Sequence, residues 1–206
     1  MSEKPAPLRI APTVPFLAIL IGLYEFQNAW LALVLYHAGI MVYLFRYHVH
    51  PRKLLHGWNT LFGLILIPIC TFTGAALYLL WPHMKLVNLN LSAGLAAFGL
   101  SGYSWHLFCI YSIVVHPVLE ELFWRGILVE GDRYPTWFDI WFAAYHVLVL
   151  VHFVKIPWLV IIFIILAFFA ALWRYLALTY KGLVIPYLCH VIGYASIFFA
   201  AYLMSL

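Results

Sequence analysis

The segment HPVLEELFWRG, residues 116–126, places two adjacent carboxylates and an arginine at the end of a long apolar run. Ionised side chains inside a bilayer cost about 2.5–3.5 kcal/mol each on insertion scales, so they are usually paired and functional. Glu121 and Arg125 are four residues apart, one helical turn, and can neutralise each other. Glu120 then remains as an additional carboxylate. Pro117 removes a backbone donor four residues before Glu121, which predicts a kink where the acidic residues begin.

The composition of the whole chain is that of a membrane protein. Of its 206 residues, 67% are hydrophobic and only 9% are charged, whereas soluble domains carry about 25% charged residues. We therefore predict an all-α, polytopic membrane bundle of about 6–8 helices, surrounded by membrane lipids. The basic residues fall mostly in short loops, where they set topology, so they do not indicate a nucleic-acid partner. Cys70, Cys109 and Cys189 lie in apolar runs and are expected to be free core residues.

Polar breaks divide the chain into a tail and one membrane-embedded domain. Residues 1–13 are expected to form a polar N-terminal tail, and residues 14–206 the single helical domain. The apolar run 14–45 is either one over-long tilted helix or a hairpin that turns near Glu25. We favour the hairpin, since it places the basic residues of the tail on the side of the basic loop 46–56. Further helices are expected at 57–81, 91–100, 103–129, 136–153, 158–180 and 183–206.

Charge and capping signals orient these helices. The tail and the loop 46–56 are cytoplasmic by the positive-inside rule, so the helix that carries the acidic residues ends at the cytoplasmic face. The membrane is expected to be a plasma or inner membrane, or the endoplasmic reticulum in a eukaryote. Thr136 followed by Asp139 has capping-box spacing, so Asp139 is interpreted as a helix cap.

Two histidines fall at the depth of Glu120. Glu120 lies about nine residues before the end of its helix, His146 about nine residues into the following helix, and His190 about seven residues into the last one. At 1.5 Å per residue, all three lie roughly 10–14 Å from the same face. The other transmembrane histidines, such as His37, are interpreted as satisfied core or interface residues.

Water activation is the chemistry that fits this set. A glutamate desolvated by lipid can act as a general base, while a histidine holds the water or protonates the leaving amine and a second one stabilises the oxyanion. The alternative is a catalytic zinc bound by Glu120, His146 and His190, with His116 as an additional ligand. We favour the metal-free interpretation, since the sequence has no HExxH helix.

At these residues the sequence resembles the CAAX protease and bacteriocin-processing (CPBP, or Abi) family of intramembrane proteases. The EExxxR motif occupies residues 120–125, with Pro117 and Gly126 at its flanks. FxxxH occupies Phe142 to His146, and the third motif begins at His190. The resemblance covers about residues 100–200 and includes a likeness to the type II CAAX prenyl endopeptidases.

The resemblance implies a multi-helix membrane peptidase that cleaves a peptide or a protein substrate, prenylated in the best-known members. Glu120 would be the base, and Glu121 would hold Arg125. His146 and His190 would position the water and stabilise the oxyanion. One position departs from the family, since Tyr194 stands where the third motif has Asn or Asp. Tyr194 is expected to reach a substrate carbonyl or to hydrogen-bond Glu120 or His190, unless it is simply an aromatic that faces lipid or the core.

Two other classes of protein are alternatives. One is a non-catalytic relative, acting in bacteriocin immunity or as a subunit of a membrane complex, whose acidic residues only hold helices together. The other is a haem or quinone protein that uses transmembrane histidines. Glu120 favours the peptidase, because an inert scaffold does not need a carboxylate beside an already neutralised pair.

Overall fold

A computed structural model describes residues 6–128 and 135–205. Within these ranges the chain is helical and contains no strand, which confirms the predicted all-α membrane bundle. The α-helices are α1 (Ala6–Ile10), α2 (Val14–Ile19), α3 (Ala29–Arg46), α4 (Thr60–Met84), α5 (Leu91–Ala97), α6 (Gly102–Val114), α7 (His116–Glu121), α8 (Trp137–Leu150), α9 (Ile156–Tyr180) and α10 (Val184–Ser205). The 3-10 turns are η1 (Ala11–Thr13) and η3 (Pro51–Leu55), and the π-helical segments are η2 (Leu20–Glu25) and η4 (Leu122–Ile127).

The first two long helical runs form the predicted hairpin. The elements α1, η1, α2 and η2 follow one another without a break as far as Glu25, and α3 returns after Asn28. The side-chain oxygen of Asn28 accepts a hydrogen bond from the backbone N–H of Leu31 (2.9 Å) and caps α3. The two helices approach closely, because a Cβ at Gly22 would lie 2.3 Å from the backbone nitrogen of Ala32.

The helical domain begins before residue 14. The tail predicted for residues 1–13 is helical from Ala6 on, and Ala11 and Pro12 are buried. Prolines at the first positions of a helical turn are tolerated because the N–H that they lack has no intrahelical partner there. Residues 1–5 of the predicted tail lie outside the described residues.

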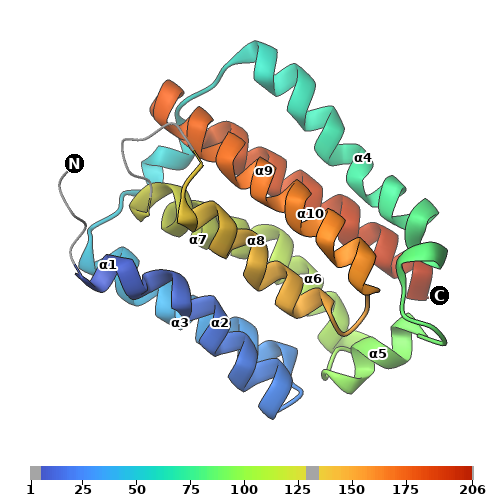
Figure 1. Cartoon of the computed structure of the whole chain (residues 1–206). Helices are drawn as coiled ribbons and strands as arrows, with labels where there is room; N and C mark the ends of the chain where they lie inside the picture. The colour runs from blue at the N-terminus through green and yellow to red at the C-terminus, as the bar shows by residue number, and fades with distance from the viewer. Residues whose placement is uncertain (1–5, 129–134, 206) are drawn as a thin grey trace.

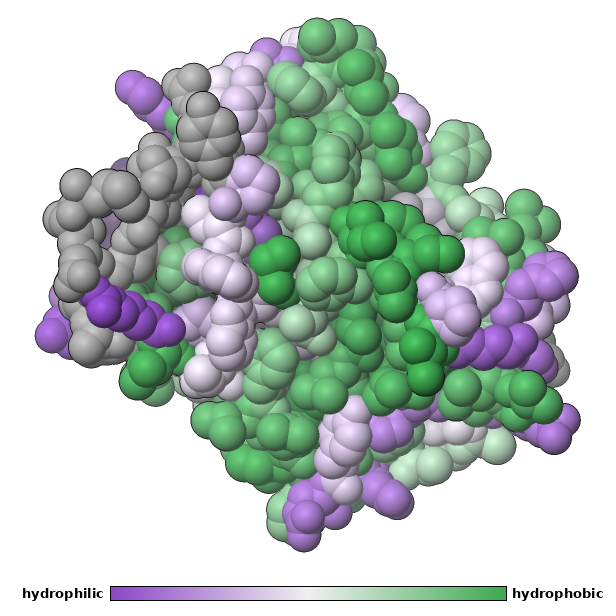
Figure 2. Space-filling view, viewed as in Figure 1, coloured by the Kyte–Doolittle hydropathy of each residue, from purple (hydrophilic) through white to green (hydrophobic). Residues whose placement is uncertain are grey.

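Six helical segments of the described chain are long and apolar enough to cross a membrane. The chain is therefore a multi-pass membrane protein. Figure 2 shows a largely hydrophobic surface between the two ends of the bundle, with strongly hydrophilic residues mainly toward those ends. The helix α8 has 14 residues, about 21 Å of length, which is less than the hydrocarbon core of a bilayer.

The hairpin and α4 flank the remaining helices on opposite sides (Figure 1). Between them lie α6 to α10, with α10 packed against both α4 and α7. The helix that carries the acidic residues is interrupted at Val115, beside Pro117, and continues through α7 into η4. This interruption is where the sequence predicted a kink. The π-helical segment η4 directly follows the two acidic residues, and such segments are frequent at functional sites.

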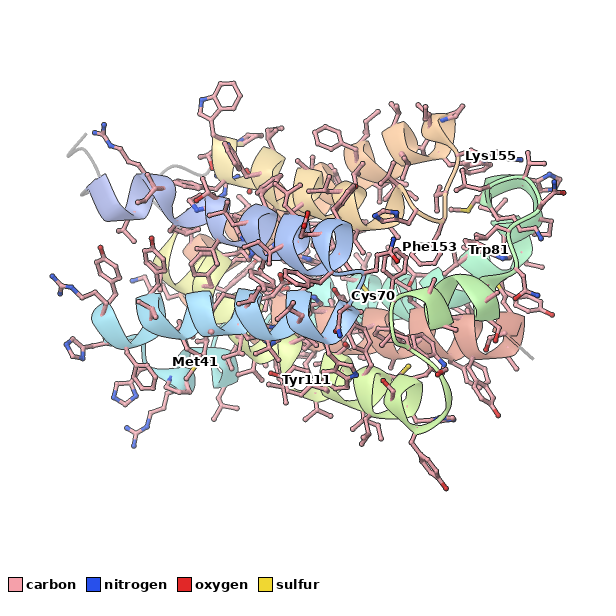
Figure 3. The ribbon with its side chains drawn as sticks, turned by 90° about the horizontal axis from the view of Figure 1, so that it is seen from below. Met41, Cys70, Trp81, Tyr111, Phe153 and Lys155 are labelled. Carbon is pink, nitrogen blue, oxygen red and sulfur yellow. The ribbon has the colours of Figure 1, made fainter. Side chains whose placement is uncertain are left out.

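Backbone hydrogen bonds tie the inter-helix loops together at each end of the bundle. At one end Leu183 N donates to Lys53 O and Val184 N donates to His56 O, both at 2.9 Å. At the other end Lys155 N donates to Met84 O (2.9 Å), and Figure 3 shows Lys155, Trp81 and Phe153 toward the same end of the bundle. The basic residues Arg46, Arg52, Lys53 and Lys181 therefore belong to the first end, against Lys85 and Lys155 at the second.

The contact between α4 and α10 depends on the absence of a side chain at Gly74. A Cβ at Gly74 would lie 2.0 Å from the backbone oxygen of Ser196, whereas one at Gly193 would meet nothing within 4 Å. We expect Gly74→Ala to destabilise the protein by about 1–3 kcal/mol through overpacking. Thermal unfolding in detergent measures this, with Gly193→Ala as the matched control. An unchanged midpoint in Gly74→Ala would contradict the close packing of these helices.

Candidate active site

Two adjacent carboxylates lie at the centre of the bundle. Glu120 and Glu121, the last two residues of α7, are both fully buried. Because successive residues of a helix point about 100° apart, the two side chains meet different neighbours. Burial of a charge is tolerated only with partners, so the neighbours define the chemistry of each carboxylate.

One oxygen of Glu120 is held by two tyrosines. Its Oε1 accepts hydrogen bonds from the hydroxyls of Tyr36 on α3 and Tyr145 on α8. The Tyr36 hydroxyl itself accepts from the indole N–H of Trp124, at 2.9 Å. Three helical elements besides α7 therefore fix the orientation of this carboxylate.

The other oxygen of Glu120 faces two histidines. Among the described residues, Oε2 is buried and has no hydrogen-bond partner. It lies 3.3 Å from Nε2 of His116 and 3.5 Å from Nε2 of His190. A buried, unsatisfied carboxylate oxygen is costly, and this one faces two imidazoles that can exchange protons or bind a ligand.

Glu121 has the partners that the spacing predicted, and one more. Its Oε1 lies 3.3 Å from Nη1 of Arg125 and 2.8 Å from Nδ1 of His190. The Arg125 guanidinium also stacks over the ring of Phe142, 4.2 Å from its centroid. Glu121 therefore joins the predicted ion pair to His190, a link that sequence spacing did not indicate.

His146 reaches Glu120 through Tyr145. Its Nδ1 lies 2.8 Å from the carbonyl oxygen of Phe142, and its Nε2 lies 3.2 Å from the Tyr145 hydroxyl. These contacts are consistent with the prediction that Glu120, His146 and His190 lie at one depth in the membrane. Both ring nitrogens of His146 are engaged, by Phe142 and Tyr145, so its connection to Glu120 runs through the Tyr145 hydroxyl.

Tyr194 bonds a residue other than the two expected. Its hydroxyl lies 3.0 Å from Nε2 of His116, and its ring packs on His190 with centroids 4.8 Å apart. The expected bonds to Glu120 or His190 are therefore replaced by one to His116. His116 in turn contacts His37 (2.9 Å between Nδ1 and Nε2), which is buried as predicted but belongs to this polar network.

Sequence reasoning missed Tyr36 and Tyr145 and underrated His37. Tyr36 and His37 come from the hairpin, far from the three motifs, and their only signal is a polar pair on an apolar helix. Tyr145 directly precedes the motif histidine, where an aromatic in an aromatic-rich chain carries no signal of its own.

The potential metal ligands differ from the set that the sequence suggested. Ligand atoms of His116, Glu120 and His190 lie within 4.8 Å of one another, so His116 takes the place expected for His146. The separations of 3.3 and 3.5 Å from Glu120 fit neighbouring ligands of a tetrahedral zinc ion, which are about 3.3 Å apart for metal–ligand distances of about 2.0–2.1 Å. These residues therefore fit a divalent metal geometrically.

Asp139 combines the predicted cap with a second role. Its Oδ2 accepts from the backbone N–H of Thr136 (2.8 Å), which is the cap that the sequence predicted. The same carboxylate forms a buried ion pair with Arg174 of α9. It therefore fixes α8, and with it Tyr145 and His146, against α9.

The pair Glu121–Arg125 offers a stability test. We expect Arg125→Ala and Glu121→Ala each to destabilise the protein by about 3–5 kcal/mol, because each leaves a buried charge without its partner. The double variant should be milder than the sum of the two. Unfolding midpoints in detergent measure these effects, with Arg46→Ala, an exposed arginine, as the control. Strict additivity would argue against a direct interaction.

Comparison with known proteins identifies the segment that holds the site. Residues 102–196 match the family described as type II CAAX prenyl endopeptidase Rce1-like, and the match includes all three motifs. A search of curated proteins and a search of solved structures found no match. Helices α1 to α5 lie outside the matched segment, although α3 supplies Tyr36 and His37. The resemblance inferred from the motifs is therefore confirmed: from residue 102 to residue 196 the chain is similar to the Rce1-like type II CAAX prenyl endopeptidases.

Proposed function

We propose that this chain is an intramembrane, glutamate-dependent endopeptidase that hydrolyses a peptide bond near the cytoplasmic face of the membrane. The observation that carries this proposal is the asymmetric setting of Glu120. Two tyrosine hydroxyls hold its Oε1, whereas Oε2 has no hydrogen-bond partner in the described part of the chain. Oε2 of Glu121 also lacks a hydrogen-bond partner among the described residues, but Oε2 of Glu120 lies within 3.5 Å of Nε2 of both His116 and His190. A general base needs such a free oxygen beside groups that can hold the water.

His190 is suited to hold the water. Glu121 can only accept a hydrogen bond when it is ionised, so Nδ1 of His190 carries the proton that it donates to Oε1 of Glu121. The Nε2 lone pair of the neutral ring then faces Oε2 of Glu120, 3.5 Å away. A water molecule at this position can donate one proton to each group. Glu120 takes one proton, and the hydroxide attacks the scissile carbonyl carbon.

The proton then returns to the leaving amine. Collapse of the tetrahedral intermediate breaks the C–N bond, and the amine takes the proton from Glu120. Tyr145 links Oε1 of Glu120 to Nε2 of His146. Because the Phe142 carbonyl only accepts, Nδ1 of His146 is protonated, and Nε2 can accept the Tyr145 hydroxyl proton only when that proton is not donated to Glu120. His146 therefore assists through Tyr145 rather than by touching the substrate.

The proposed cytoplasmic location rests on charge. Glu120 lies seven residues before the end of η4 at Ile127, about 10 Å along the helix. This is the end of the bundle to which Arg46, Arg52, Lys53 and Lys181 belong, and such residues mark the cytoplasmic side. A peptide or protein substrate, prenylated as the name of the matched family suggests, would enter from this side. The membrane would be a plasma or inner membrane, or the endoplasmic reticulum of a eukaryote.

Glu120→Gln tests the base directly. We expect a loss of turnover with normal folding and insertion, because the amide keeps the shape of the side chain but cannot take a proton. The assay follows cleavage of a farnesylated peptide with a CAAX C-terminus and of its unprenylated counterpart. The exposed Glu25 provides the control variant, Glu25→Gln. Wild-type activity in Glu120→Gln would remove Glu120 from the mechanism.

Metal dependence is a separate prediction. If Glu120 acts as a free base, long incubation with strong chelators should leave peptidase activity unchanged, and the purified protein should contain much less than one zinc per chain. Activity and elemental analysis of the same preparation measure this. Inhibition by a chelator that zinc reverses would instead make Glu120, His116 and His190 the ligands of a catalytic ion.

A further inference from the structure

A chain of four hydrogen-bonded side chains crosses the bundle beside Glu120. The Tyr111 hydroxyl lies 2.8 Å from Nδ1 of His37, and Nε2 of His37 lies 2.9 Å from Nδ1 of His116. Nε2 of His116 lies 3.0 Å from the Tyr194 hydroxyl. The four residues come from α6, α3, α7 and α10, so the chain connects helices across the whole site. Figure 3 shows Tyr111 near the middle of the bundle's length, away from both ends.

The hydrogen bonds of these four side chains must all be donated in the same direction. A neutral imidazole has one N–H donor and one acceptor nitrogen, so the protons run either from Tyr111 toward Tyr194 or the opposite way. Nε2 of His116 also lies 3.3 Å from Oε2 of Glu120. Because the proton of His190 is on Nδ1, that ring already presents a lone pair to this oxygen. A second lone pair, on His116, would add to the repulsion, whereas an N–H on His116 is attracted. Nε2 of His116 therefore carries the proton, and its Nδ1 accepts from His37.

The direction of the chain decides what Tyr194 can do. With Nε2–H of His116 donating, the Tyr194 hydroxyl is an acceptor, and its own proton remains available. Its ring lies against those of His190 and His116, with centroids 4.8 and 5.2 Å away. In the opposite direction the tyrosine proton would be used by His116, and no hydroxyl donor would remain there.

We propose that Tyr111, His37 and His116 are positioning residues that keep the Tyr194 hydroxyl proton free to be donated to the oxyanion of the tetrahedral intermediate. This inference rests on the proposed peptidase function. It gives a role as oxyanion donor to Tyr194, the residue at which this protein departs from the third motif of the family. It also gives a positioning role to His37 of α3, a helix that lies outside the segment matched to the family.

The first experiment compares two substitutions of His37 on the farnesylated CAAX peptide. His37→Leu removes the donor to His116 and should lower kcat at least about tenfold at nearly constant KM, and by no more than the 10²–10³-fold expected for loss of one oxyanion donor. His37→Gln should restore most of kcat, because its amide N–H can occupy the position of Nε2. The control is His106→Leu, since His106 is exposed and its Nδ1 bonds the carbonyl of Gly102 on its own helix. Equal losses in His37→Gln and His37→Leu would overturn the proposal.

The second experiment asks whether His37 acts through Tyr194. Tyr194→Phe should lower kcat by about 10²–10³-fold, and His37→Leu in that background should add almost nothing. Additive effects on kcat would mean that His37 has an independent, merely structural role. Persistent activity in Glu120→Gln would instead reject the proposed peptidase mechanism, so the two failures are distinguishable.

A third measurement does not depend on activity. In protein labelled with ¹⁵N-histidine, the His116 signals are identified as those missing from His116→Ala. We expect a protonated Nε2 and an unprotonated Nδ1, and a loss of this tautomer preference in His37→Leu but not in His106→Leu. A protonated Nδ1 in the wild-type protein would show that the chain runs the other way and would overturn the proposal even if the peptide is never cleaved.

Discussion

The burial of two adjacent carboxylates is the constraint on which the rest of the structure depends. Glu120 and Glu121 are fully buried in a bundle that the surrounding lipid cannot solvate. Each needs hydrogen-bond donors, and no single helix can supply donors in all directions. The partners come from α3, α8 and α10 and from η4 on the same helix. The way in which the helices pack around α7 therefore decides where these hydrogen-bond donors lie.

The two carboxylates have different environments, and this difference gives the site its chemistry. Glu121 is bound by a cation and an imidazole N–H, which keep it as a fixed anion. Its main effect is on His190, whose tautomer it sets. Both acids are bound through Oε1 only, but Glu120 is held by tyrosine hydroxyls rather than by a cation, and its Oε2 faces the Nε2 atoms of His116 and His190. One acid thus organises the site, and the other is left with an oxygen that can take a proton, a division of roles that follows from their environments.

The N-terminal hairpin extends the site beyond the matched segment. Tyr36 and His37 are consecutive on α3, and they contact Glu120 and His116, which are one turn apart on α7. The short separation of the hairpin helices at Gly22 and the cap at Asn28 hold α3 in position. The hairpin therefore contributes to both acid orientation and the histidine chain, in addition to crossing the membrane.

The sequence by itself determined the membrane bundle, the cap at Asp139 and the Glu121–Arg125 pair, and it favoured the hairpin over a single long helix. These features depend on hydropathy, turn residues and helical spacing, which are local along the chain. Only the tertiary structure decided that His116 rather than His146 directly faces Glu120, that Tyr36 and Tyr145 hold it, and that Tyr194 bonds His116. Contacts between helices depend on the rotation of each helix about its axis. A rotation of one residue, about 100°, exchanges the side chain that faces the site, and no sequence spacing between different helices records it.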